Sequence, residues 1–413
     1  MKKIGRWQGA GLLATTLLGT SVFILPQLTY QIAASDALWV WMLLTVSIIP
    51  VTIVFAKLAG LFPHAAGPAY FVEKAFGATL GKSIGLIFLL IVPLGVPAAI
   101  LMTVSFVDAI FDLDQQQQLF TSLLMLFILF LMNIKGIQVS AKVQFGITIS
   151  IVLVVLLLLI SSGLTAPRIH FNVLTTPTEL SPILIASGIA FWSFIGVEAM
   201  THLSTEFENP KKDMLPAMLY GTFIVGLIYL ACTYLIVVNP NDGSIIMATI
   251  FDELLGGYGS FIIGGLGIAG GISTTNVYTA SATRLMASFA KSGTLPSQLA
   301  KTNTFGVPVP ALIVILLTMS CTLIISFILG QDLEDLISWV NGVFVIIYLG
   351  SMLAALKLLP KKYGMAIAFG LVFCCMLALG LSGDMLYAGL LFFLAIIIIH
   401  WQTKRKAAIT DLI

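Results

Sequence analysis

Apolar stretches of about 20 residues recur along the whole of this 413-residue chain, and they limit its fold more than any other feature. A helix of roughly 20 apolar residues crosses the hydrocarbon layer of a bilayer. Only 9% of the residues are charged, against roughly 25% in an ordinary soluble domain. The sequence therefore predicts an all-α integral membrane protein. We expect about 12 transmembrane helices, at residues 8–33, 37–60, 83–111, 117–134, 143–164, 182–204, 214–238, 258–290, 309–330, 335–358, 364–381 and 385–401.

The loops between these helices are short, and no linker or charge run marks a separate soluble domain. We therefore predict one membrane domain over residues 1–413. Loops that carry Lys and Arg stay on the cytoplasmic side of a membrane. With the N-terminus inside, every one of the 20 Lys and Arg except Arg168 falls on that side. We expect both termini in the cytoplasm and the chain in the cell inner membrane.

The distribution of basic residues and the spacing of the cysteines argue against nucleic acid and metal ions as partners. The basic residues are spread over many loops rather than gathered on one face, so nucleic acid is not an expected partner. Four cysteines lie in apolar spans, and none has the C-x-x-C spacing of a metal or redox site. We expect small buried side chains at Cys232, Cys321, Cys374 and Cys375, with no metal and no cofactor.

The first apolar stretch contains LLGTSVFILP at residues 17–26, which is an unfavourable sequence for a continuous membrane helix. Gly19 weakens a helix by about 1 kcal/mol relative to Ala, and Pro26 suits the first turn of a helix that restarts. A helix that breaks inside the hydrocarbon leaves polar backbone groups that protein or a cavity must receive. Thr20 and Ser21 bring hydroxyls to this place. A small-residue packing face is an equally good interpretation of this stretch alone.

The sixth span carries FWSFIGVEA at residues 191–199, with Gly196 followed by Glu198 near its middle. A charged side chain at the bilayer centre costs about 2.5 kcal/mol or more, so such a residue is normally functional. The alternative is a structural Glu bonded to the loose backbone beside Gly196. Breaks in the first and sixth spans indicate two inverted five-helix repeats. These would cover residues of about 8–164 and 182–358, followed by two accessory helices at about 364–401.

Five motifs occur in order along nearly the whole chain. They are LLGTSVFILP (17–26), FPHAAGPAYF (62–71), WSFIGVE (192–198), EFENPKKDMLPA (206–217) and SATRLMASFAKSGTLP (281–296). Together they resemble the amino acid, polyamine and organocation (APC) transporter superfamily. That resemblance implies a LeuT-type 5+5 inverted repeat with discontinuous helices 1 and 6. LLGTSVF and VNGVFVIIYLGSML (340–353) look most like the bacterial exporters of methionine and branched-chain amino acids.

The resemblance also implies how a zwitterionic amino acid would bind. Its carboxylate suits the N-terminal end of a half-helix, and its ammonium suits the carbonyls at a half-helix C-terminus. The implied substrate-binding residues are Gly19, Thr20 and Ser21 for the carboxylate, and Trp192, Ser193 and Ile195, with Gly196 beside them, for the ammonium. Trp192 and Tyr278 would form the wall against the substrate side chain, although each is as easily explained by packing.

The expected function is secondary active transport of neutral amino acids such as methionine, leucine, isoleucine or valine, most simply as efflux by proton coupling or exchange. Glu198 is the proposed proton carrier, because a carboxyl removed from water favours its neutral form. His202, four residues on, would relay protons or simply cap its helix. Some family members have a lysine in the fifth helix in place of sodium, yet residues 143–160 contain no basic residue. The coupling ion therefore stays open.

Other functions remain as alternatives. An importer, or an exchanger of cationic amino acids or polyamines, would use the same fold, but the intramembrane segments offer no second acid as a counter-ion. An intramembrane enzyme would need a nucleophile with a base, or a metal cluster, and no such motif is present. A channel is disfavoured, because paired broken helices suit a site that closes on both sides.

Overall fold

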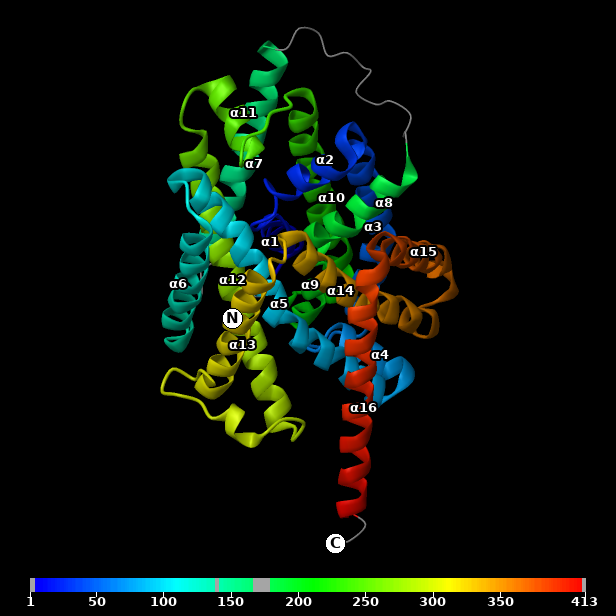
Figure 1. Cartoon of the computed structure of the whole chain (residues 1–413). Coiled ribbons are helices and arrows are strands. Elements are labelled where there is room, and N and C mark those ends of the chain that lie inside the picture. Colours follow the sequence, from blue (N-terminus) through cyan, green and yellow to red (C-terminus); the bar gives the residue numbers. More distant parts are fainter. Residues whose placement is uncertain (1–3, 138–140, 166–178, 411–413) are drawn as a thin grey trace.

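The computed structural model describes residues 4–137, 141–165 and 179–410, and within them the only β-type pairing is one bridge between Ile4 and Phe207. All other regular structure there is helical (Figure 1). The α-helices are α1 (Arg6–Leu18), α2 (Leu25–Ala33), α3 (Ala37–Leu61), α4 (Pro68–Phe76), α5 (Ala78–Phe111), α6 (Gln115–Ile134), α7 (Ala141–Thr165), α8 (Leu180–Ala190), α9 (Ala199–His202), α10 (Pro210–Val238), α11 (Ile246–Leu255), α12 (Gly259–Lys291), α13 (Val309–Leu329), α14 (Leu333–Leu358), α15 (Gly364–Leu381) and α16 (Met385–Thr410).

Ten segments of the described chain are long and apolar enough to cross a membrane. The all-helical membrane class predicted from the sequence is confirmed, but 12 spans were expected. Two of the ten segments, Leu25–Leu61 and Lys361–Gln402, each contain two helices joined by a short 3-10 turn. Leu25–Leu61 covers the end of the expected span at 8–33 and the whole of that at 37–60, and Lys361–Gln402 covers the expected spans at 364–381 and 385–401. With 13 residues, α1 is too short to count alone.

The third expected span also differs at its start. The FPHAAGPAYF segment forms a loop and α4, and Gly77, with φ 96°, then joins α4 to α5. A residue with a side chain rarely adopts this positive φ, so the glycine allows the sharp turn between the two helices. Arg168, the one cation expected outside, lies beyond the described residues.

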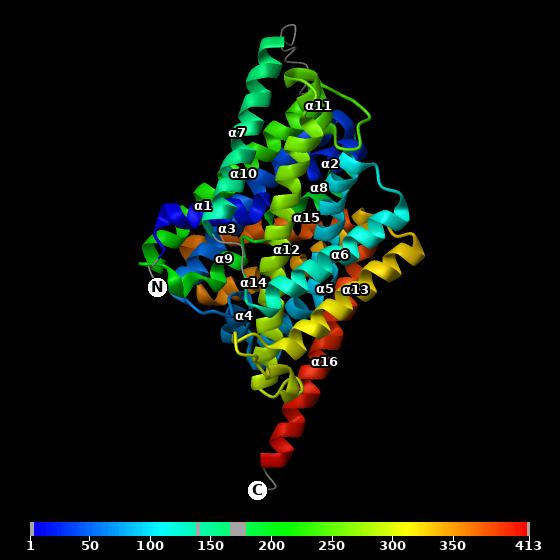
Figure 2. The ribbon, with the colours of Figure 1, turned by 90° about the vertical axis from the view of Figure 1, so that its left-hand side faces the viewer.

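The centre of the molecule is built from helices that come from distant parts of the chain. α10 packs against α3 and α1, α12 packs against α5, and α14 packs against α5 and α15. Figure 2 shows α7 along one edge, beside α1 and α10. Trp41 of α3 stacks on Tyr229 of α10 with ring centroids 4.4 Å apart, and its Nε1 donates to Thr29 Oγ1 of α2 at 2.9 Å. These contacts fix α2 against the α3–α10 pair.

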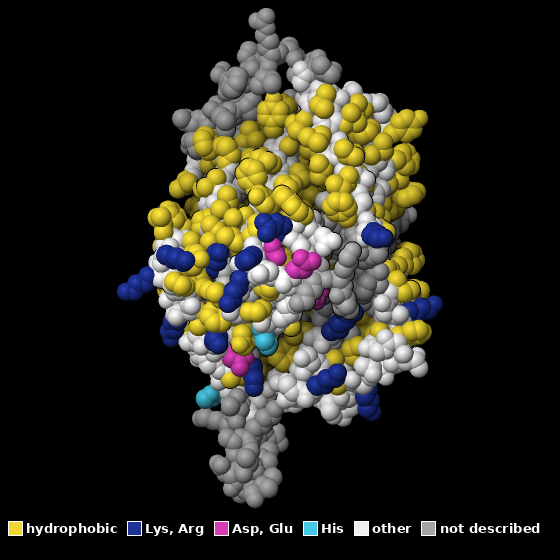
Figure 3. All heavy atoms as spheres, turned by 180° about the vertical axis from the view of Figure 1, so that it is seen from behind, with side chains coloured by type: hydrophobic (Ala, Val, Ile, Leu, Met, Phe, Trp, Pro, Cys, Tyr) yellow, Lys and Arg dark blue, Asp and Glu magenta, His cyan; other side chains and the backbone are white. Residues whose placement is uncertain are grey.

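The outer surface is largely apolar, as a lipid-facing surface must be. Figure 3 shows apolar side chains over one part of the face opposite to that of Figure 1, with Lys and Arg gathered next to this zone. The cysteines follow this pattern, since Cys232 and Cys374 are buried whereas Cys321 and Cys375 are exposed. The expectation of four buried cysteines was wrong for two, because an apolar residue in a membrane helix faces lipid as readily as protein.

Candidate functional site

The first predicted break is present in the structure. α1 ends at Leu18, α2 begins at Leu25 with a proline in its first turn, and residues 19–24 form turns between them. Gly19 has φ 24°, and a Cβ at this position would lie 2.8 Å from Thr274 Oγ1 of α12. Both the positive φ and the close approach require glycine. The interruption therefore follows directly from the LLGTSVFILP sequence.

This break leaves hydrogen-bond donors uncovered. The Ser21 carbonyl accepts from the amides of Ile24 (3.1 Å) and Leu25 (2.9 Å), which starts α2. Within the described residues, no intramolecular hydrogen bond involves the amides of Thr20 or Ser21. The N-terminal end of a helix also carries about half a positive charge. Unpaired amides near a helix N-terminus are groups that can accept a carboxylate as a ligand.

The side chains at this break are held by protein groups. Ser21 Oγ and the Tyr229 hydroxyl are 2.7 Å apart, and that hydroxyl donates to the Leu17 carbonyl at 3.2 Å. Thr20 Oγ1 lies 3.7 Å from the sulfur of Met102. The backbone, more than the hydroxyls, is therefore what the break offers to a ligand.

The second predicted break is present as well. α8 ends at Ala190, Phe191–Phe194 form a 3-10 turn, Ile195 is extended, and α9 starts at Ala199. Gly196 between them has φ 128°. A Cβ on Gly196 would lie 2.9 Å from Leu17 Cδ2 and 3.1 Å from Thr16 Cγ2 of α1. The second break therefore packs directly against the last turn of α1, just before the first break.

Most carbonyls at the end of α8 already have partners. Asn341 Nδ2 of α14 donates to the carbonyls of Gly188 (2.7 Å) and Ile189 (3.1 Å), and Ser193 Oγ donates to that of Ala190 (2.7 Å). In the described part of the chain, no hydrogen bond reaches the carbonyls of Ser193 or Ile195. These two acceptors lie at the negative end of a half-helix, which suits a cation such as an ammonium.

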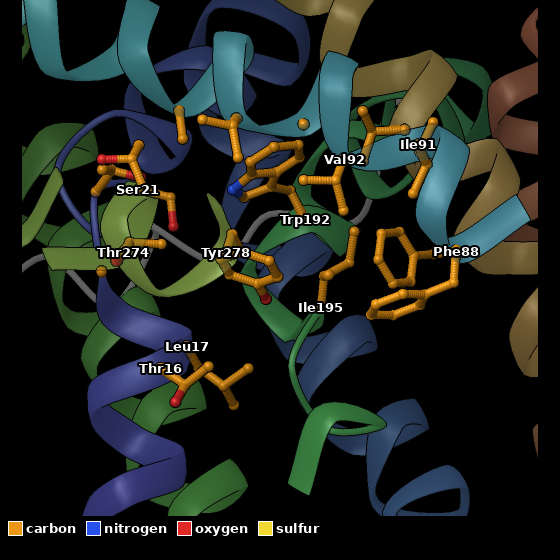
Figure 4. A pocket seen from close by; sticks show the side chains of 18 residues that line it. Thr16, Leu17, Ser21, Phe88, Ile91, Val92, Trp192, Ile195, Thr274 and Tyr278 are labelled. Carbon is orange, nitrogen blue, oxygen red and sulfur yellow. The ribbon is translucent and has the colours of Figure 1, made fainter. Parts of the chain in front are cut away.

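A hollow of about 60 Å³ lies between the two breaks. In Figure 4, Ser21 and Thr274 lie at one end of it, Phe88 and Ile91 lie at the other, and Trp192 stands between them. The hollow is thus polar at one end and apolar at the other. All 18 of the described residues that line it are uncharged: Thr16, Leu17, Gly19, Thr20, Ser21, Phe88, Ile91, Val92, Gly95, Val96, Ala99, Trp192, Ile195, Thr274, Thr275, Tyr278, Val340 and Phe344.

The hollow contains six of the predicted site residues, namely Gly19, Thr20, Ser21, Trp192, Ile195 and Tyr278. Ser193, Gly196, Glu198 and His202 are not part of its lining. The wall formed by α5 and α14 was not predicted from the sequence. Its only sequence signal is the spacing of small and apolar residues three and four apart on α5, which an ordinary packing face shares.

Glu198 is completely buried, and its contacts are those of the structural alternative. Its Oε2 accepts from the Gly196 amide at 3.0 Å and from the Tyr348 hydroxyl at 2.6 Å. The Tyr348 ring packs edge-on against Phe55 and Phe191. Glu198 Oε1 has no hydrogen-bond partner among the described residues. The carboxyl thus links the second break to α14 through hydrogen bonds, and its other oxygen accepts none from the described residues.

His202 does not meet Glu198. Its Nδ1 lies 2.7 Å from the Ala65 carbonyl in the loop before α4, and its ring lies 5.6 Å from that of Phe88. Among the described contacts there is none between the two side chains, because Glu198 turns back toward Gly196. His202 instead lines a second hollow of about 210 Å³, together with Glu73, Lys82 and Phe88. Phe88 lines both hollows.

Known proteins of one family resemble this chain over nearly all its length. The amino acid permease family profile matches residues 4–404. The L-methionine/branched-chain amino acid exporter YjeH of Escherichia coli (strain K12) is 32% identical over 392 residues, which are 94% of this chain and 93% of that protein. The uncharacterized amino acid permease YecA of Bacillus subtilis (strain 168) is 27% identical over 390 residues, which are 91% of this chain and 90% of that protein.

A more distant relative is the cadaverine/lysine antiporter of Escherichia coli (strain K12), with 21% identity over 84% of this chain and 80% of that protein. The proteins named here are permeases, exporters and antiporters, which are transporters and not enzymes. With its interrupted helices and ten apolar segments, the chain is a multi-pass membrane protein that belongs to the amino acid permease family of the APC superfamily.

Proposed function

We propose that the protein is a secondary transporter that moves neutral amino acids with apolar side chains by alternating access. One observation carries this proposal: the hollow between the two breaks is uncharged, polar at one end and apolar at the other. A zwitterion has no net charge but needs one anion site and one cation site. Backbone groups at the two breaks offer both without a charged side chain.

In the proposed complex, the substrate carboxylate accepts from the amides of Thr20 and Ser21. The ammonium donates to the carbonyls of Ser193 and Ile195. The side chain then lies along Trp192 and the apolar wall of α5, with Tyr278 on the opposite side. Of the residues expected from the sequence, Ser193 contributes through its carbonyl alone, and Gly196 contributes by allowing the turn of the second break.

We propose methionine, leucine, isoleucine and valine as substrates and export as the direction. The similarity to an exporter of methionine and branched-chain amino acids supports both. The same fold runs either way with the gradients that it couples, so an importer or an exchanger is the alternative. A diamine such as cadaverine is a poorer fit, because the 18 lining residues include no carboxylate to balance a second positive charge.

The architecture we propose is 12 spans in one domain, with inverted repeats at about 8–164 and 182–358 and accessory helices at about 364–401. Breaks in the first and the sixth expected spans favour this arrangement. It places both termini in the cytoplasm of a cell with the chain in its inner membrane. The gathering of Lys and Arg next to an apolar zone is consistent with a cytoplasmic face.

Proton coupling is proposed through Glu198. Its carboxyl is fully buried at the second break, and one of its oxygens has no hydrogen-bond partner among the described residues, so it is free to hold a proton. His202 is the proposed second group on the path, because its ring and Phe88 border the other hollow. A third, small hollow between α1, α7 and α12 is lined by hydroxyls and by Gln144, with no basic residue from α7.

Counterflow in proteoliposomes tests the proposal. Vesicles loaded with unlabelled substrate should accumulate labelled leucine and methionine, and they should ignore arginine and glutamate. Measurements at two pH values test the coupling. Uptake of arginine without leucine would contradict the assignment of the hollow to an apolar side chain.

A further inference from the structure

Lysines that lie over aromatic rings form one patch on the surface, outside the transport site. Five lysine–ring contacts are present in the described residues, and they involve four lysines, Lys57, Lys74, Lys357 and Lys362. These come from the end of α3, from α4, from the end of α14 and from the turn before α15. α4 packs against α14, and α15 packs against α3 and α14. The contacts therefore gather where these four helices meet.

The closest grouping is around Tyr363. Lys57 Nζ lies 5.8 Å from the centre of this ring, and Lys362 Nζ lies 5.3 Å from it. Lys361 is the next residue along and is exposed. Among the described residues, no Asp or Glu lies within ion-pair distance of these lysines, and the one ion pair there joins Arg6 to Asp213. Two ammonium groups beside the same ring, with no acidic partner among the described residues, attract an anion.

An apolar stripe starts directly beside this group. Met365, Phe369 and Val372 on α15 are 74%, 59% and 65% exposed, and their spacing places them on one face of the helix. Ile367 and Phe373, on the other side, are buried. The segment that is long and apolar enough to span a membrane starts at Lys361, so we expect the lysines at the level of the lipid headgroups and the stripe in the hydrocarbon.

We propose that this patch binds one anionic phospholipid. Its phosphate lies between Lys57 and Lys362 beside Tyr363, and an acyl chain follows Met365, Phe369 and Val372. Ammonium groups supply the charge, and the aromatic ring fits the headgroup level. Because Lys57 belongs to α3 and Lys362 to the link between α14 and α15, the lipid joins these helices at their membrane-surface ends.

Native mass spectrometry of the full chain in an uncharged detergent tests the proposal, with phosphatidylglycerol, phosphatidylcholine and inorganic phosphate as probes. Phosphatidylglycerol should bind, and the other two should not. Each lysine near an anionic headgroup contributes about a factor of five. The double variant Lys57→Gln with Lys362→Gln should therefore bind phosphatidylglycerol roughly 25-fold more weakly.

The matched control is Lys211→Gln with Lys212→Gln, which removes the same charge from exposed residues at the start of α10. It should bind as the unmodified chain does. Phe369→Ser keeps the charges, interrupts the stripe and should weaken phosphatidylglycerol alone. Equal phosphatidylglycerol binding by both double variants would overturn the site, and binding of inorganic phosphate that Phe369→Ser does not alter would overturn the lipid assignment.

Discussion

We predict that Gly95→Ala will exclude long substrates from the transport site while leaving the fold intact. Gly95 lies on the face of α5 that lines the hollow. A Cβ at this position would lie 3.8 Å and 3.9 Å from Val340 Cγ1 and Cγ2, and 4.0 Å from Trp192 Cη2. These are ordinary van der Waals distances, so no atom has to move. Because Ala favours a helix by about 1 kcal/mol over Gly, stability should not fall.

The added methyl group should instead weaken the binding of substrates with long side chains. The added methyl group stands in the gap between α5 and Trp192, where the end of an apolar side chain is proposed to lie. Forcing one extra carbon into a filled pocket costs about 1–3 kcal/mol, and pockets discriminate a single methylene roughly 10- to 200-fold. Transport of leucine and methionine should drop by about that factor. Alanine, which does not reach the gap, should be transported as before.

The assay is uptake of labelled leucine, methionine and alanine in proteoliposomes, with protein amount and melting temperature measured in parallel. Gly389→Ala is the matched control, because it changes an exposed glycine on α16 with no atom within 4 Å of the new Cβ. An unchanged leucine-to-alanine ratio in the Gly95 variant would refute the placement of the side chain. Failure of the unmodified protein to transport either substrate would instead refute the proposed function.

Three further changes test the site. Glu198→Gln should abolish transport or remove its pH dependence. The chain should still insert into the membrane, since an amide oxygen can keep the contact with the Gly196 amide. The measurement is uptake as a function of pH, and an unaltered pH profile would exclude Glu198 from proton coupling. Gly270→Ala should lower the melting temperature and weaken leucine binding, because its Cβ would lie 2.7 Å from the Gly19 carbonyl oxygen. Gly265→Ala on the same helix is the control, since its Cβ would meet no atom within 4 Å. Equal melting temperatures and equal leucine binding of the two variants would contradict the close approach at the first break. Asn341→Ala should destabilise the fold by about 1–3 kcal/mol per uncovered carbonyl, and thermal unfolding in detergent that matches the unmodified chain would show that the contacts with α8 are dispensable.

The sequence was informative where it departs from a good membrane helix. Gly19 and Gly196 sit in apolar runs where a glycine weakens a helix, and both breaks are where they were expected. Glu198 was found as an unusual residue, but its contact with the Gly196 amide depends on the turned backbone of the break. The spacing of four residues predicted that His202 would lie beside Glu198 on one helical face. The break in the helix turns the two side chains apart.

The apolar wall of the hollow was beyond such an argument. Leu90 is 38% exposed, whereas its neighbours Ile91 and Val92 are buried and line the hollow. Lipid, protein and substrate side chain are all apolar, so the sequence carries no polarity difference that separates these environments. The number of spans stays a prediction for a related reason, because two of the ten apolar segments found among the described residues each contain two helices joined by a short turn.

The contact between the end of α1 and the second break has a mechanical consequence. Leu17 and Thr16 occupy the space where Gly196 has no side chain, so the end of α1 rests directly on the unwound backbone of the other segment. A movement of either half-helix would have to change this contact. We therefore expect α1 and the second break to move together, and a substrate that bridges both to favour one arrangement of the pair.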